Sequence, residues 1–161
     1  MLSVLPSIVV LGMVALYALA LARRRPSPPQ KTAERRKASH ALALATGLQC
    51  VHFLEEASTG FHEQFPAMLG LPGMSYSVFV AFNLTWIAIW IASIAGLRSA
   101  RPAAFFAAWF LAAAGVLNGI GHPLMAIVTG DYFPGLWSSP FIGLACAWTW
   151  SKLRAATSTG R

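Results

Sequence analysis

Long apolar stretches separated by short polar segments dominate the pattern along the chain. Crossing a bilayer takes a helix of roughly 20 apolar residues. The pattern predicts an all-α fold, a polytopic membrane helical bundle of about five transmembrane helices that forms one domain over residues 1–161. The predicted spans are residues 2–22, 38–57, 76–97, 102–128 and 137–151.

The first apolar stretch has a rival interpretation as a signal peptide, because the Ala-Leu-Ala at residues 18–20 is similar to a cleavage site. A signal peptide carries positive charge before its apolar stretch. Here no basic residue precedes the stretch, and three arginines follow it at residues 23–25. The charge order therefore favours a membrane span over residues 2–22.

Composition supports a lipid environment, since 57% of the residues are hydrophobic and 11% are charged, against about 25% charged in soluble domains. The formal charge of +7 would suggest nucleic acid in a soluble protein. In this chain the basic residues stand in short groups between apolar stretches, so we expect the lipid bilayer as partner and no nucleic acid. The two cysteines exclude a thiolate metal cluster and a disulfide-rich scaffold.

The distribution of basic residues predicts the orientation. With five spans, a basic loop at 23–37, a turn at 98–101 and the C-terminal tail lie on one face, and together they hold every Lys and Arg. The positive-inside rule then places the N-terminus outside and the C-terminus in the cytoplasm. We expect a multi-pass protein of the inner (plasma) membrane.

Ionisable residues within the predicted spans mark a candidate site. His52, Glu55 and Glu56 share one face of the second span, and Asn118 and His122 share a face of the fourth. An ionisable group at mid-bilayer costs roughly 2.5–3.5 kcal/mol, so these side chains should face the bundle interior. The alternative is that the glutamates only cap the helix end while His52 bonds a backbone carbonyl.

Depth along the helices groups the same residues. At 1.5 Å per residue, His52, Asn83 and His122 all lie roughly 8–10 Å below the outer ends of their spans. This indicates one shared site. For Asn83 the alternative is structural, since a single asparagine in a membrane bundle often only forms a hydrogen bond between helices. His62 and Glu63, in the outer loop 58–75, are either a solvated pair or a lid that adds ligands.

Three glycines of the fourth span suggest close helix approach. They are Gly115, Gly119 and Gly121, and small residues of this kind let neighbouring membrane helices pack closely.

The run His52-Phe53-Leu54-Glu55-Glu56 matches the signature of the HXXEE family of uncharacterised bacterial membrane proteins. Asn118 and His122, which precede a Gly/Pro-rich turn, also resemble the later part of that family. The resemblance implies a site at these residues but no particular reaction. A weaker resemblance is to EXPERA-type sterol isomerases, five-span proteins with a His and a Glu four apart on one helix. His52, Glu56, Asn83 or Asn118, and Trp86 would be the matching residues.

One interpretation of the cluster is a metal centre. His52, Glu56 and His122 would bind Fe, Mn or Zn, since imidazole and carboxylate suit these metals. Glu55 would be a fourth ligand or a base, and Asn118 would orient His122. Such a site suits an enzyme that acts on an apolar or lipid-like substrate.

The second interpretation needs no metal. Two adjacent carboxylates, Glu55 and Glu56, cannot both ionise easily in low dielectric. With His52 they would act as an acid/base pair in an isomerase or cyclase of an isoprenoid or sterol-like lipid. Asn83, Trp86 and Asn118 would then bind the substrate, with the Trp86 or Trp90 ring stabilising a cation. A third interpretation is a non-catalytic lipid-binding or proton-relay subunit, as an oligomer or within a larger assembly.

Overall fold

The computed structural model describes residues 5–157, with side chains from residue 9 onward, and this part of the chain contains helices and no strand. The all-α prediction is therefore confirmed. The helices are α1 (Leu5–Arg24), α2 (Thr32–Thr59), α3 (Phe61–Ala67), α4 (Tyr76–Arg98), α5 (Pro102–Thr129) and α6 (Ser139–Thr157). Residues 2–4 of the first predicted span and Arg161 of the predicted tail lie outside the described residues.

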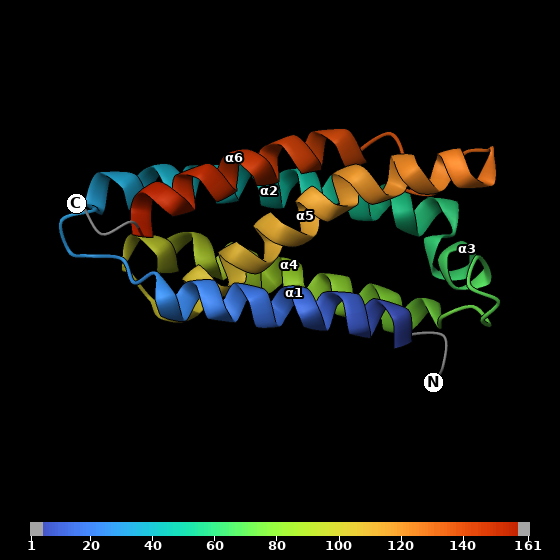
Figure 1. Ribbon diagram of the computed structural model, residues 1–161, viewed down its shortest axis with the longest axis horizontal. Helices are drawn as coiled ribbons and strands as arrows, with labels where there is room; N and C mark the ends of the chain where they lie inside the picture. The colour runs from blue at the N-terminus through green and yellow to red at the C-terminus, as the bar shows by residue number, and fades with distance from the viewer. Residues whose placement is uncertain (1–4, 158–161) are drawn as a thin grey trace.

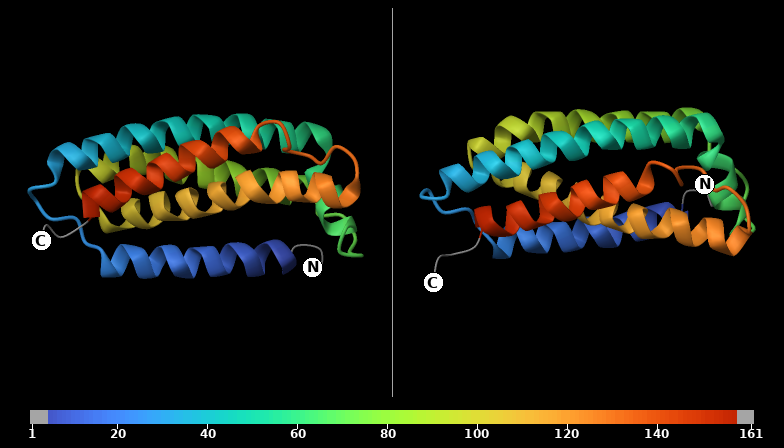
Figure 2. Two further views of the ribbon diagram at one scale, coloured as in Figure 1. Left: turned by 45° about the horizontal axis from the view of Figure 1, so that its top comes forward. Right: turned by 90° about the horizontal axis from the view of Figure 1, so that it is seen from above.

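The five long helices lie side by side and alternate in direction along the chain (Figure 1). Helix α2 packs between α4 and α6, while α5 packs against α6, α4 and α1. Helix α1 lies on the outside of this arrangement (Figure 2). The short helix α3 lies at the end of the bundle where α2 and α5 finish (Figure 1). Consequently α2 and α5 run in the same direction and bring their C-terminal turns to one end.

Several helix ends differ from the expected loop boundaries. The basic loop predicted at 23–37 is shorter, because α1 continues to Arg24 and α2 begins at Thr32. The outer loop predicted at 58–75 contains α3, and the last helix extends to Thr157. Hydropathy locates the edge of the apolar region, whereas polar residues with good helix propensity continue a helix beyond it. The buried Arg35 guanidinium supports this early start of α2 by donating to the Pro28 carbonyl oxygen at 2.8 Å.

Two of the helices, α4 and α5, are long and apolar enough to cross a membrane by length and composition. Helix α2 is longer than α4, but its first two turns are highly charged and its last turns carry the polar cluster. All five predicted spans coincide with helices, and the five-span topology itself stays a prediction.

Small residues set the spacing between α5 and α6. A Cβ atom added to Gly119 would lie 2.8 Å from the Cα atom of Gly143, and one added to Gly115 would meet the Cys146 sulfur. These two glycines thus serve the close approach that the sequence suggested. Gly121 does not, because a Cβ there meets nothing within 4 Å. The spacing along the helix did not reveal which face each glycine occupies.

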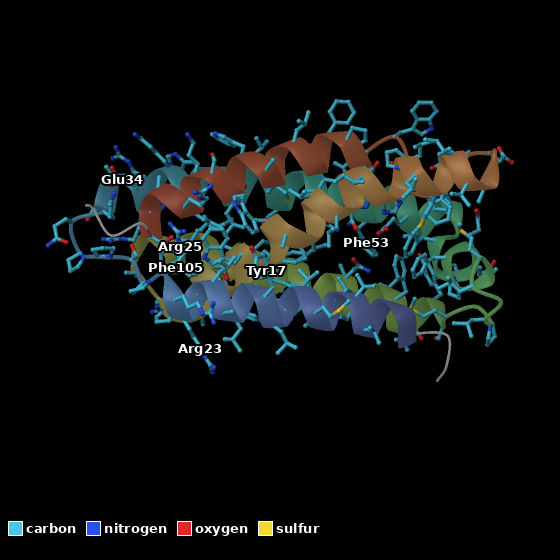
Figure 3. All side chains as sticks on the ribbon, viewed as in Figure 1. Tyr17, Arg23, Arg25, Glu34, Phe53 and Phe105 are labelled. Carbon is cyan, nitrogen blue, oxygen red and sulfur yellow. The ribbon has the colours of Figure 1, made fainter. Side chains whose placement is uncertain are left out.

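Basic side chains gather at the end of the bundle opposite α3 (Figure 3). They belong to the α1–α2 connection with the adjoining turns of α1 and α2, to the end of α4 and the α4–α5 turn, and to the last turns of α6. Arg25 and Ser27 in the first of these segments bond to the end of α6, through the Thr157 hydroxyl at 3.4 Å and the Ala156 carbonyl oxygen at 2.8 Å. The basic segments therefore lie at one end of the bundle and α3 at the other.

Candidate functional site

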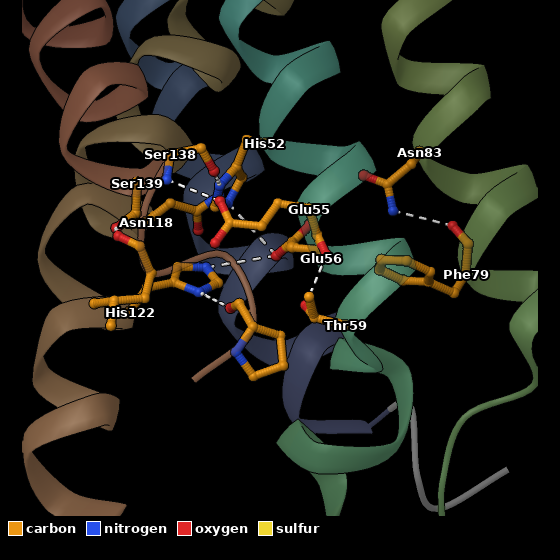
Figure 4. Close-up of polar contacts among 12 residues, drawn as sticks. His52, Glu55, Glu56, Thr59, Phe79, Asn83, Asn118, His122, Ser138 and Ser139 are labelled. Atoms are coloured by element: carbon orange, nitrogen blue, oxygen red, sulfur yellow. Dashed lines mark hydrogen bonds and ion pairs between the residues drawn. The ribbon is translucent and has the colours of Figure 1, made fainter. Parts of the chain in front are cut away.

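Three buried side chains from α2 and α5 meet inside the α3 end of the bundle (Figure 4). The Oε1 atom of Glu56 lies 3.5 Å from Nε2 of His52 and 3.4 Å from Nε2 of His122. The exposed fractions of the three residues are 5%, 0% and 4%. One ligand atom from each of the three lies within 4.8 Å of the other two. We call His52, Glu56 and His122 the triad.

Local helix geometry explains this convergence. His52 and Glu56 are four residues apart on α2 and therefore share a face. His52 stands seven residues before the end of α2 at Thr59, and His122 stands seven residues before the end of α5 at Thr129. Because α2 and α5 run in the same direction, equal distance from their C-terminal ends puts the two imidazoles at one level.

Hydrogen bonds to the second ring nitrogens fix both imidazoles. Nδ1 of His122 donates to the Pro134 carbonyl oxygen at 2.6 Å, since a carbonyl can only accept. Nδ1 of His52 contacts the Ser138 hydroxyl at 2.8 Å. The Asn118 amide nitrogen lies 3.3 Å from Nε2 of His52 and donates to it. In this arrangement both Nε2 atoms carry a lone pair, that of His122 beside Glu56 and that of His52 also in contact with the Asn118 amide.

The triad therefore places three electron-pair donors face to face. The His122 lone pair and the Glu56 carboxylate oxygen repel each other unless a proton or a cation lies between them, while the His52 lone pair also accepts a hydrogen bond from Asn118. Glu56 could supply a single proton, and a metal ion would satisfy all three atoms at once. This need for a shared positive centre is the main chemical property of the site.

The neighbouring Glu55 has a different position. Its Oε1 atom accepts hydrogen bonds from the Tyr132 hydroxyl at 2.7 Å and the Trp137 backbone N–H at 3.0 Å. Its Oε2 atom accepts from the Ser138 backbone N–H at 2.8 Å. A carboxylate at the start of α6 also suits the positive end of the helix dipole. Glu55 thus fastens α2 to the connection between α5 and α6. The sequence suggested Glu55 as a ligand or base, but these three hydrogen bonds engage both of its carboxylate oxygens.

Tyr132 belongs to the same fastening. Burial, and then the hydrogen bond that it donates to Glu55, raise the pKa of the Tyr132 hydroxyl above its ordinary value of 10.0. The hydroxyl therefore keeps its proton, and remains a donor to Glu55, throughout the neutral range.

The connection between α5 and α6 also lies directly on the imidazoles. A Cβ atom on Gly135 would come within 2.7 Å of His122 Nδ1 and 2.8 Å of His52 Cε1. The φ of Gly135 is +87°, in the region that favours glycine. Sequence reasoning missed the contributions of Gly135, Pro134 and Ser138. Their signal was present only as a Gly/Pro-rich turn after His122.

Aromatic rings cover the side of the triad toward α3. The ring centroids of Phe61 and Phe133 lie 5.5 and 5.7 Å from that of His122. Of the predicted lid residues, His62 lies against the rings of Tyr76 and Phe79 and is 3.6 Å from Glu63. Within this segment Phe61 contacts the triad, whereas His62 points to α4 and pairs with the exposed Glu63, so the structure shows the pair that the sequence offered as the alternative to a lid.

Of the predicted substrate-binding residues, Asn118 contacts the triad, whereas Asn83 and Trp86 make other contacts. Asn118 touches His52, although we expected it to orient His122, whose partner is the Pro134 carbonyl. Asn83 donates to the Phe79 carbonyl oxygen of its own helix at 3.0 Å (Figure 4). Trp86 packs on Phe110 with ring centroids 4.3 Å apart. Depth grouped Asn83 with the triad, and depth does not specify the side of a helix. Trp86 was suggested by the weaker resemblance to sterol isomerases.

Comparison with known proteins gives one match. No curated protein matches the chain, and no solved structure does. The model of a family described as "Protein of unknown function with HXXEE motif" matches residues 43–149. That segment contains the triad, Glu55 and the whole α5–α6 connection, and the motif letters fall on His52, Glu55 and Glu56. The chain belongs to the HXXEE family.

Proposed function

We propose that the protein is a multi-pass membrane enzyme that binds one divalent transition metal through His52, Glu56 and His122. Its substrate would be an apolar or lipid-like molecule. The observation that carries the proposal is the convergence of three buried lone-pair donors on one point, with no positive group of the described chain between them.

The ligand set and two of the donor distances suit zinc. Two ligands bonded to zinc at about 2.1 Å and separated by a tetrahedral angle stand about 3.4 Å apart. An octahedral metal at the same bond length would hold neighbouring ligands about 3.0 Å apart. The distances from Glu56 Oε1 to the two Nε2 atoms are 3.5 and 3.4 Å. Two histidines and one glutamate are also a ligand set of catalytic zinc, which leaves a fourth position for water or substrate.

The surroundings of the histidines support the same proposal. Histidines that bind metals usually donate the other ring N–H to a carbonyl, a carboxylate or water, which fixes the ring and its tautomer. His122 donates in this way to Pro134. A metal on His52 Nε2 would take the lone pair that Asn118 now contacts. The Asn118 amide would then be free to donate to an oxygen atom at the open position, which gives it a role in positioning substrate.

A lipid setting is supported by the outer surface of the bundle. Large apolar side chains are exposed along all five long helices, where a soluble protein of this size would present charge. Examples are Leu16 on α1, Leu54 on α2, Ile91 on α4, Ile127 on α5 and Leu144 on α6, each at least 56% exposed.

Charge supports an orientation with the N-terminus outside and the C-terminus in the cytoplasm of the plasma membrane, because the basic residues gather at one end of the bundle. The triad would then lie in the outer half.

A metal-free function is the second candidate, and one contact favours it. If Asn118 donates to His52 Nε2 and a protonated Glu56 donates to His122 Nε2, every lone pair of the triad is satisfied without a metal. A protonated Glu56 beside a neutral imidazole is an acid/base pair of the kind that moves a double bond in an isoprenoid or sterol-like lipid.

Metal content of the purified protein distinguishes the two. The proposal expects about one zinc per chain in protein purified without chelator, and its loss in His52→Gln and in Glu56→Gln. His62→Gln and Glu63→Gln are matched controls, because these residues lie at the same end of the bundle without touching the triad, and they should retain the metal. Stoichiometric iron or manganese would support a metal centre at the triad but show that the metal is not zinc. Protein that stays metal-free after incubation with each of the three metals would refute the metal centre and favour the acid/base function.

Topology reporters test the membrane part separately. Alkaline phosphatase fused after residue 161 should be inactive, and a fluorescent protein fused there should fold and fluoresce, since the C-terminus is proposed to be cytoplasmic. The phosphatase fused in the α5–α6 connection at Asp131 should be active. The opposite pattern would reverse the orientation and place the triad in the inner half.

A further inference from the structure

A second polar site lies at the opposite end of the molecule from the triad. The cleft between the start of α2 and the end of α4 has a volume of about 470 Å³. We call it the basic cleft, and its lining residues are Thr32, Ala33, Arg36, His40 and Arg98. That volume falls within the roughly 300–1,000 Å³ of small-molecule sites.

Two guanidinium groups face this cleft from helices that are far apart in sequence, Arg36 from α2 and Arg98 from α4. Among the side chains that the structure describes, residues 9–157, carboxylates form ion pairs only with histidines, so no described carboxylate neutralises either arginine. Two unpaired cations brought to one cleft repel each other, and an anion between them removes that cost.

Arg98 is also held in place. Its Nε atom donates to the Ser39 hydroxyl at 2.9 Å, and Ser39 is fully buried between the helices. This bond uses one edge of the guanidinium and leaves its terminal nitrogens for another acceptor. A planar guanidinium fixed in this way matches the paired oxygens of a phosphate group.

We propose that the basic cleft binds the phosphate group of an anionic molecule, gripped between Arg36 and Arg98. Under the membrane orientation proposed above, on which the choice of a lipid depends, the cleft lies at the cytoplasmic surface. Basic pockets between helices on that side of a membrane bind anionic lipid headgroups. The source of the phosphate is therefore an anionic phospholipid, or a soluble phosphate compound that offers the same oxygens.

Thermal unfolding of the full-length protein in a neutral detergent tests the proposal. Phosphatidylglycerol, phosphatidylcholine and inorganic phosphate are each titrated against the wild type and against Arg36→Gln/Arg98→Gln. The control is Arg23→Gln/Arg24→Gln, which removes the same charge from the same end, on exposed residues outside the cleft. A saturable rise in Tm is expected for the wild type and the control, with the apparent affinity of the cleft variant about tenfold weaker or worse.

The ligands separate the two sources. A rise in Tm with phosphatidylglycerol alone assigns the cleft to a lipid headgroup, and a rise with inorganic phosphate alone assigns it to a soluble phosphate. No response to either ligand overturns the proposal, as does an equal loss in the control variant, which would reveal general charge attraction. If the double variant does not fold, native mass spectrometry of phosphatidylglycerol adducts on Arg36→Gln alone gives the same decision. None of these results depends on the metal or on the orientation in the membrane.

Discussion

Replacement of Gly135 by alanine is the sharpest test of the geometry around the triad. The added Cβ atom would stand 2.7 Å from His122 Nδ1 and 2.8 Å from His52 Cε1, so both imidazoles must move. Forcing an extra methyl group into a packed site costs about 1–3 kcal/mol. An alanine at φ +87° adds about 1–2 kcal/mol of backbone strain. We expect Gly135→Ala to lower the free energy of unfolding by about 2–5 kcal/mol.

A matched glycine in the same connection separates the two causes. Gly130 has a φ of +70°, and a Cβ there meets nothing within 4 Å, so Gly130→Ala carries the backbone strain alone. Denaturant titration in detergent micelles measures both variants, and metal analysis accompanies it. The two variants should differ by about 1–3 kcal/mol, and only Gly135→Ala should lose metal. Equal destabilisation with equal metal content would refute the contact between Gly135 and the imidazoles.

Three further predictions concern the fastening and the helix packing. Glu55→Gln should lower the free energy of unfolding by about 1.5–3 kcal/mol, because it weakens charge-assisted hydrogen bonds. It should also weaken metal binding measured by competition with a chelator, and an unchanged metal affinity would contradict the role of Glu55 in holding the connection at the triad. Because the folded protein holds the Tyr132 proton to a higher pH than the unfolded chain, stability should fall as pH rises above about 10, and Tyr132→Phe should remove that part of the Tm profile. Gly119→Ala should lower the free energy of unfolding by about 1–3 kcal/mol, because its Cβ atom would meet Gly143. Gly121→Ala should be neutral or stabilising by up to about 1 kcal/mol, and the reverse order would be inconsistent with the α5–α6 packing.

Local periodicity was sufficient to predict much of the molecule. The lengths of the apolar stretches indicated the five long helices, and a spacing of four residues placed His52 and Glu56 on one face. His122 joined them by depth, because two helices that end at the same side of a bundle bring equal distances from their ends to one level. These features depend on distances within one helix or on the alternation of direction, which a sequence displays directly.

The remaining features depend on contacts that a loop conformation decides. Glu55 and Glu56 are adjacent and chemically identical in the sequence, yet one faces the triad and the other faces the start of α6. The helix spacing does not reveal that residues 132, 137 and 138 bind Glu55, because that contact depends on the conformation of the α5–α6 connection. Asn83 shares the depth of His52, yet its side chain bonds to its own helix.

The fastening of the α5–α6 connection to α2 has a consequence for biogenesis. The triad residues are complete once α5 has been synthesised, but Pro134 and Ser138, which orient the two imidazoles, come later in the chain. A chain synthesised only through α5 therefore contains the three triad residues without the groups that orient their rings. If the triad binds metal as proposed, docking of the last helix completes the site, and a chain truncated before Ser138 should not load metal.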